Sequence, residues 1–290
     1  MTIQLPFDLL ALIIDFVAAD AFSDGKKVHC TTDLRQCALV SQQLAVYCQR
    51  HIFSHIEISY AKSFAIWNLQ RVLDKNRVVG SYIKTLSLAL RPPKFHFQPK
   101  IDRILDKCTR VTSLAVYCHH DRRSGLDWNL DIPKSTQIAL ESIIHSPMCK
   151  TLHFDGIRMP FSVFSNPRRR CGVGSLSFTK RQSALQILVD LPNNILDQGP
   201  SYSSLRFLSI LPSLVPALLS PKFHDGRRLF ELSDLETLWV DYRHRPRDVQ
   251  PDVTAQLLCT TGSLRSLGFK LGCTCCIPRV HVRFLIVLSS

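Results

Sequence analysis

The sequence predicts a mixed α/β protein: a small three-helix unit at the N-terminus, followed by an irregular repeat of helices and short strands. Apolar residues recur at helical spacing as far as about residue 58. A six-residue phrase then returns along the rest of the chain. The composition, 46% hydrophobic and 20% charged over 290 residues, is typical of a folded chain. We therefore expect two units, residues 1–58 and 59–290.

The opening stretch LPFDLLALIIDFV predicts an amphipathic helix. Pro6 suits a first helical turn, and Asp8 in that turn complements the helix dipole. The stretch lacks the basic start of a secretory signal, and its acidic residues interrupt the apolar run that a membrane span needs. We expect either a core helix or a handle for another protein. The apolar residues at helical spacing are Leu5, Leu9, Leu10, Ile13, Ile14 and Val17.

The stretch LRQCALVSQQLAVYCQRHIF predicts one long helix, or two helices with a break near Val40 and Ser41. The polar segment before it predicts a loop, with Asp33 as the N-cap of the next helix. The alternation in FSHIEIS predicts a short strand. Three short helices in about 55 residues can hardly bury all their apolar surface alone. An Asp in place of Ile13 should disable the unit, because an unpaired charge on an apolar face is costly.

The repeated phrase has the form apolar, any residue, Thr or Ser, Leu, any residue, apolar, with one looser copy. Helix-like runs precede several copies, so the repeating unit is helix, turn and short strand. The pattern resembles the leucine-rich repeat, in which strands line a concave face and helices form the outer layer. The alternative is an ordinary α/β domain with similar buried strands. Uneven spacing between copies predicts irregular curvature. The central leucines are Leu86, Leu114, Leu152, Leu176, Leu208, Leu238 and Leu267.

The N-terminal unit resembles the F-box, especially the divergent F-box-like domains of fungi. That family opens with Leu-Pro, an acidic residue and an apolar helix. It continues with Leu-x-x-Cys/Ala-x-x-Val-Ser and closes with an aromatic residue and an apolar strand. Here the segment between the first helix and Asp33 is longer than in the compact F-box, and the Trp that commonly follows Val-Ser is absent. The residues that carry the resemblance are Leu5, Pro6, Asp8, Leu34, Cys37, Val40, Ser41, Phe53 and Ile56.

The resemblance implies a non-catalytic substrate receptor of an SCF-type (Skp1–cullin–F-box) ubiquitin ligase. The F-box would dock on a Skp1-like adaptor of the cullin complex, and the repeats would capture an unidentified protein target. Ubiquitin transfer would take place on other subunits, with the receptor raising the effective concentration of the target. No cofactor is implied. The residues expected to bind the adaptor or to shape its docking surface are Leu5, Pro6, Leu9, Leu10, Ile13, Leu34, Val40 and Ser41.

The charge is strongly positive and unevenly distributed. The whole chain carries +13, whereas residues 1–60 hold four basic and six acidic residues, a net of −2. The remainder is therefore +15, which predicts two parts with different partners. If the loops after the strands share one edge, their arginines form a basic rim; otherwise they are a dispersed, solvated surface. The rim arginines are Arg122, Arg123, Arg168, Arg169, Arg170, Arg243 and Arg245.

A basic rim suits an acidic or phosphorylated protein target. Nucleic acid is less favoured, because few aromatic side chains lie near these arginines to stack on bases. The alternative function is a repeat-based binding protein outside any ubiquitin ligase, whose rim contacts nucleic acid or another anionic partner. Salt separates the two, because phosphate binding falls steeply as salt rises.

The eleven cysteines do not form a disulfide framework, since their number is odd and no signal peptide is recognised. Reduced thiols in the cytoplasm or nucleus are expected, with no membrane association. No G-x-S-x-G, H-E-x-x-H or phosphate-loop motif occurs, so we expect no enzymatic activity. Cys273, Cys275 and Cys276 are weak candidates for a metal site, because a structural zinc normally takes four ligands in two spaced pairs.

The stretch from residue 273 to residue 290 departs from the repeat phrase and contains a mostly apolar run, Val280 to Leu288. A solenoid normally ends in a polar cap. These residues therefore either form a last strand or differ from the natural sequence.

Overall fold

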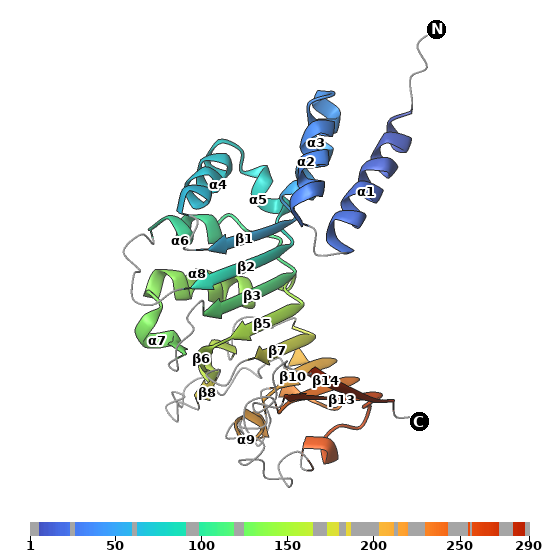
Figure 1. The fold of residues 1–290 in the computed structure, drawn as a ribbon. Coiled ribbons are helices and arrows are strands. Elements are labelled where there is room, and N and C mark those ends of the chain that lie inside the picture. Colours follow the sequence, from blue (N-terminus) through green and yellow to red (C-terminus); the bar gives the residue numbers. More distant parts are fainter. Residues whose placement is uncertain are drawn as a thin grey trace.

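The computed structural model describes most of the chain, and the structural statements below refer to the residues that it describes. It shows a mixed α/β protein, as predicted, and the protein is built around a mostly parallel sheet (Figure 1). The described residues are 6–23, 27–59, 63–90, 99–118, 125–164, 173–179, 184–186, 203–211, 214–219, 230–242, 255, 257–272 and 281–287.

The N-terminal unit contains three helices: α1 (Phe7–Ser23), α2 (Lys27–Ala38) and α3 (Gln42–Ile52). The predicted break near Val40 and Ser41 is confirmed. Ser41 has extended backbone, and its hydroxyl accepts a hydrogen bond from the Leu44 N–H at 3.2 Å, which caps α3.

The predicted loop before Asp33 is wrong, because α2 already begins at Lys27 and Asp33 lies inside it. The Thr-Thr-Asp run has low helix propensity, which is the reason a loop is expected there. Tertiary packing outweighs that propensity: Leu34 is buried in a core shared by the three helices, and such packing supplies most of the stability of short helices.

One nine-stranded sheet forms the centre of the molecule, and its strand order follows the chain. Eight strands run parallel, and the last one pairs antiparallel with its neighbour. The strands are β1 (His55–Ser59), β2 (Thr85–Leu90), β3 (Ser113–Cys118), β5 (Thr151–Asp155), β7 (Ser175–Thr179), β10 (Phe207–Ile210), β12 (Thr237–Asp241), β13 (Ser266–Gly272) and β14 (His281–Val287).

Every copy of the repeated phrase forms one of these strands, and all copies share one register. Leu86 lies opposite Leu114, and the match continues strand by strand to Leu267. These leucines are buried, and together they form the main core with larger side chains such as Trp128 and Phe154. The leucine of each copy therefore marks the buried face of its strand, and this arrangement repeats across the sheet.

Helices cover the leucine side of the sheet. In Figure 1, α4, α6 and α8 follow one another along one side of the strands, and α4 packs on α6 as α6 packs on α8. The helices outside the N-terminal unit are α4 (Ser63–Lys75), α5 (Val78–Tyr82), α6 (Pro99–Leu105), α7 (Trp128–Asp131), α8 (Lys134–Ile144), the 3-10 turn η3 (Phe161–Phe164) and α9 (Val215–Leu219).

Two small parallel sheets accompany the main one. They consist of β4 (Leu126–Asp127), β6 (Ile157–Pro160) and β8 (Ala184–Gln186), and of β9 (Ser203–Ser204) and β11 (Phe230–Glu231). Among the described helices, none has the length and apolar character that crossing a membrane requires.

The C-terminal stretch supplies the last strand of the sheet. β14 pairs with β13 along its whole length, from Gly272 opposite His281 to Ser266 opposite Val287. The predicted last strand is therefore present at residues 281–287.

Candidate functional site

Helix α1 is apolar on two opposite sides. Its inner side carries Ile14, which is 3% exposed and packs with α2 and α3 residues in a core separate from that of the sheet. Its outer side carries four large apolar residues at the spacing i, i+3, i+4, i+7, which places them on one stripe. This outer stripe consists of Leu9, Leu12, Ile13 and Phe16, with exposures of 48%, 51%, 50% and 68%.

The turn between α2 and α3 adds a second exposed apolar group, Leu39 at 85% and Val40 at 74%. The ring of Phe7 contacts Tyr47, and the Asp15 carboxylate contacts His51 further along, so α1 runs in the same direction as α3. The turn therefore lies at the end of the unit where α1 begins, which Figure 1 shows as the end away from the sheet.

A polar bridge holds α1 on α3. Asp15 accepts a hydrogen bond from the Tyr47 hydroxyl at 3.1 Å and lies 2.9 Å from the His51 Nε2. Burial raises the pKa of Tyr47, and the hydrogen bond to Asp15 and the charge of that carboxylate raise it further. The bridge fixes the rotation of α1, and with it the direction that the outer stripe faces.

The predicted adaptor residues divide into outward and inward positions. Pro6, Leu9, Ile13 and Val40 are exposed, whereas Leu34 is buried and Leu10 packs against the helical core. Ser41 caps α3, so it positions the turn. Leu5 lies outside the described residues. Sequence reasoning missed Leu12, Phe16 and Leu39, although the first two share the helical spacing of Ile13.

The face of the main sheet opposite the leucines is made mostly of small polar residues that are partly exposed. The strand register places on this polar face the residue that follows each central leucine. In β1, Ile56 lies opposite Leu86, so the equivalent residue is the one that follows Ile56. The residues are Glu57, Ser87, Ala115, His153, Ser177, Ser209, Trp239 and Gly268, of which Ser209 and Gly268 are buried.

Aromatic side chains stand on the polar face at fixed positions. A Cβ placed on Gly268 would lie 2.3 Å from a ring carbon of Trp239, so the indole ring needs a glycine at that place. On β3, burial raises the pKa of the Tyr117 hydroxyl, and the charge of Glu57 adds to that effect, whereas a hydrogen bond with Ser87 opposes it. Both rings combine a large apolar area with a polar atom, as residues at protein interfaces often do.

A row of cations follows the edge where the parallel strands begin. The residue two places before each central leucine bonds through its backbone to the equivalent residue of the next strand; for example, the Thr112 N–H donates to the Lys84 carbonyl at 2.7 Å. Of the seven aligned positions, every second one is basic and exposed, about 10 Å or two strand spacings from the next. The three positions between them are Thr112, Gly174 and the acidic Glu236. This basic row consists of Lys84, Lys150, Arg206 and Arg265.

The basic row differs from the predicted basic rim, which falls on the loops after the strands. All seven arginines named for that rim lie outside the described residues, as do Cys273, Cys275 and Cys276. The signal for the row is present in the sequence, because its members all occupy the second position of the repeated phrase. No group of His, Cys, Asp or Glu suited to a metal ion occurs within the described part of the chain.

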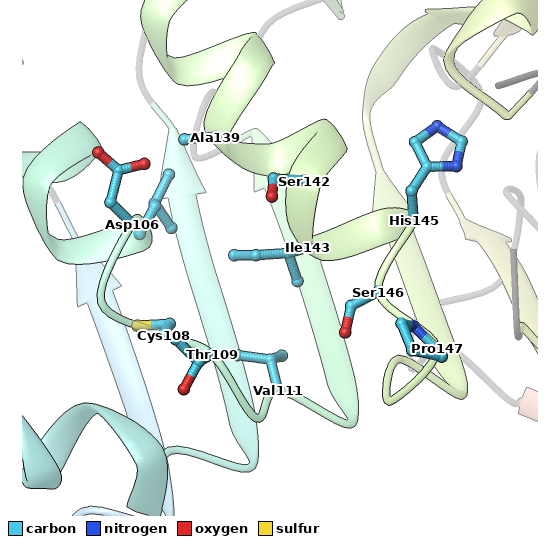
Figure 2. Close-up of a pocket in the computed structure, with 11 residues that line it drawn as sticks. Asp106, Cys108, Thr109, Val111, Ala139, Ser142, Ile143, His145, Ser146 and Pro147 are labelled. Atoms are coloured by element: carbon cyan, nitrogen blue, oxygen red, sulfur yellow. The ribbon is translucent and has the colours of Figure 1, made fainter. Parts of the chain in front are cut away.

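A hollow of about 510 Å³ lies between the turn after α6 and the end of α8 (Figure 2). Cys108 and His145 line it, and Figure 2 shows them on opposite sides of the hollow. The Cys108 thiol contacts the Ile104 carbonyl at 3.1 Å, and burial raises its pKa to about 12. The thiol is therefore protonated near neutral pH, so Cys108 offers no thiolate nucleophile in this hollow.

No family model matches the chain, and a comparison with curated proteins finds no match either.

Proposed function

We propose that the chain is a non-catalytic substrate receptor of an SCF-type ubiquitin ligase. The three N-terminal helices form a divergent F-box that docks on a Skp1-like adaptor, and the sheet with its helices forms an irregular leucine-rich-repeat solenoid that holds a protein target. One observation carries the proposal: the outer stripe of α1 and the α2–α3 turn expose large apolar residues on a unit that already has its own core.

The outer stripe supports docking because its exposure is unfavourable in the isolated chain. Large exposed apolar patches often mark interaction sites. Each half-exposed Leu, Ile or Phe side chain contributes on the order of 1 kcal/mol when a partner covers the rest of it. The outer stripe contains four such side chains, and Leu39 and Val40 enlarge the exposed apolar surface near one end of it.

The F-box assignment also explains why Val-Ser stands where it does. Val40 projects outward from the turn, and Ser41 caps the helix that follows. One residue would therefore contact the adaptor while the next one shapes the turn. At the start of α1, the Pro6 carbonyl accepts the Leu9 and Leu10 N–H groups and begins the helix.

The sheet supports the repeat assignment through its order and register. Eight parallel strands in chain order, each with its leucine aligned to the next, match a stack in which each unit contacts its neighbours. The polar face then serves as the target-binding surface. Trp239 and Tyr117 would provide the large aromatic contacts that dominate many interfaces, with small residues between them.

The experiment is co-purification of the full chain with Skp1 and the cullin subunit, comparing wild type with Ile13→Asp. Because Ile13 is half exposed, the aspartate stays hydrated, so the earlier expectation that this change disables the unit is corrected. We expect Ile13→Asp to fold normally and to lose Skp1. The matched control is Ile138→Asp on α8, where an isoleucine is 58% exposed away from the stripe.

Retention of Skp1 by the control and its loss by Ile13→Asp would support the proposal. Wild-type chain that folds and ignores Skp1 would overturn it, as would equal loss in both variants. Circular dichroism of each purified variant separates a docking defect from a folding defect.

The second candidate is a repeat-based binding protein outside any ubiquitin ligase, and the basic row favours it. Four aligned cations on one edge suit an extended anionic partner. Binding through this row should fall steeply between 50 and 200 mM salt, a range in which phosphate contacts weaken by roughly tenfold or more, whereas apolar docking through α1 should persist.

A further inference from the structure

A crevice of about 660 Å³ lies where the helical unit meets the edge at which the strands begin. Figure 1 shows the C-terminal end of α1, helix α5 and the starts of β1 and β2 meeting there. Three basic side chains line it: Arg50 from α3, Lys84 from the residue before β2, and Arg110 from the turn between α6 and β3. This junction crevice draws residues from both units.

The backbone around these cations is well held. The Lys84 N–H donates to the Ser54 carbonyl at 2.9 Å, and its own carbonyl accepts the Thr112 N–H. The Arg50 guanidinium lies over the Tyr82 ring at 5.8 Å, a cation–π contact that favours a fixed orientation of its planar group. The guanidinium of Arg50 and the backbone of Lys84 thus have defined places before any ligand arrives.

The charge of the crevice is unbalanced. Its only lining carboxylate is Asp15, and that group already accepts the Tyr47 hydroxyl and contacts His51. No carboxylate of the described residues forms an ion pair with Arg50, Lys84 or Arg110. Three positive charges against one negative charge leave a formal +2 when the lining histidines are neutral.

We propose that the junction crevice binds a phosphate group, as free phosphate or as a phosphomonoester. A phosphate carries about −1.5 to −2 charges near neutral pH, which matches the formal +2, whereas a carboxylate carries half of that. Arginine guanidinium groups bind phosphate oxygens through paired N–H donors, and two of the three cations are arginines. The site is independent of adaptor docking, because the outer stripe of α1 does not line it.

The test is titration calorimetry of the full chain with inorganic phosphate at 100 mM NaCl, using Lys84→Met and Arg110→Met. We expect each variant to bind at least tenfold more weakly than wild type. The matched control is Lys150→Met, which removes the same charge at the equivalent place of the basic row, outside the crevice. The control should bind within twofold of wild type, and acetate should bind at least tenfold more weakly than phosphate.

Two further ligands distinguish the sources of the phosphate. A hexapeptide with one phosphoserine is compared with the same peptide unphosphorylated. Tighter binding of the phosphopeptide than of inorganic phosphate would assign the crevice to a phosphorylated chain, and equal binding would assign it to free phosphate. The proposal is overturned if neither phosphate ligand binds wild type, or if Lys150→Met weakens binding as much as Lys84→Met.

Discussion

In the main sheet, the central leucines of β2, β3 and β5 are completely buried, whereas in α1 four apolar residues of one stripe stay half exposed. Both regions are rich in apolar side chains. The sheet is covered on its leucine face by a layer of helices, but among the described residues nothing covers the outer side of α1. The helical unit has a small core of its own: Ile14, Ala18, Leu34, Leu44 and Cys48.

The difference shows that apolar content and apolar burial are separate properties. The sheet buries its central leucines, since its period-2 pattern matches one buried and one polar face. Helix α1 has more apolar surface than the small core of the helical unit buries. We infer that this excess serves an interface, and the following predictions compare the two regions.

The largest difference should appear when one leucine is truncated in each region. Leu152→Ala in β5 should lower the free energy of unfolding by about 2–5 kcal/mol, because it empties a fully buried position. Leu12→Ala on the outer stripe should change it by no more than about 0.5 kcal/mol. Urea unfolding followed by circular dichroism measures both, and equal losses would mean that α1 is an ordinary core helix.

The next largest effect on stability is expected at the contact between α5 and the turn after α6. This contact lies close to the boundary of the two regions. A Cβ on Gly80 would lie 2.2 Å from the Lys107 carbonyl oxygen, so Gly80→Ala must displace backbone and should cost about 1–3 kcal/mol. Gly174→Ala is the matched control, because a Cβ there meets nothing within 4 Å. Thermal unfolding should separate the two variants, and similar melting temperatures would refute the close contact.

Two buried cysteines report how often each region opens. Burial raises the pKa of both the Cys48 and the Cys108 thiols, that of Cys108 to about 12. Alkylation by iodoacetamide at pH 8 should therefore need local opening. We expect Cys48 in the thin helical core to react at least tenfold faster than Cys108 in the main core. Peptide mass spectrometry gives the two rates, with exposed Cys259 as the fast reference; faster reaction at Cys108 would reverse the comparison.

The smallest effect concerns the ion pair between Asp74 of α4 and Lys107 after α6, which lies in the helix layer of the sheet. The hydrogen bond from Lys107 lowers the pKa of Asp74 from 3.8. The stability that this ion pair contributes is therefore present above pH 3.8 and disappears as the pH falls through the lower pKa that Asp74 has in the folded state. Asp74→Asn should melt slightly below wild type at pH 7 and together with it at the lowest pH; a gap that widens on acidification would contradict this.

Much of the sheet could be predicted, because its signal is local. Each strand contains the phrase around its central leucine, and the break at Ser41 follows from a capping residue inside an apolar helical pattern. The start of α2 could not be predicted in this way, since burial of Leu34 overrides the weak propensity before it.

The site was harder to predict, because it depends on which residues the fold brings together. Leu9 and Leu10 are adjacent and equally apolar, yet one faces outward and the other packs on the core. Lys84 and Lys150 are far apart in the chain, and only the strand register aligns them on one edge. Arg50 and Arg110 approach Lys84 through the packing of the two units.

The most direct test of the central claim is hydrogen exchange of the full chain with and without Skp1. If the outer stripe is an interface, amides of α1 and of the α2–α3 turn should exchange at least tenfold more slowly in the complex, while β2 to β7 stay unchanged. Unchanged exchange in α1 with Skp1 present, or protection confined to the sheet, would contradict the assignment of the N-terminal helices as the docking unit.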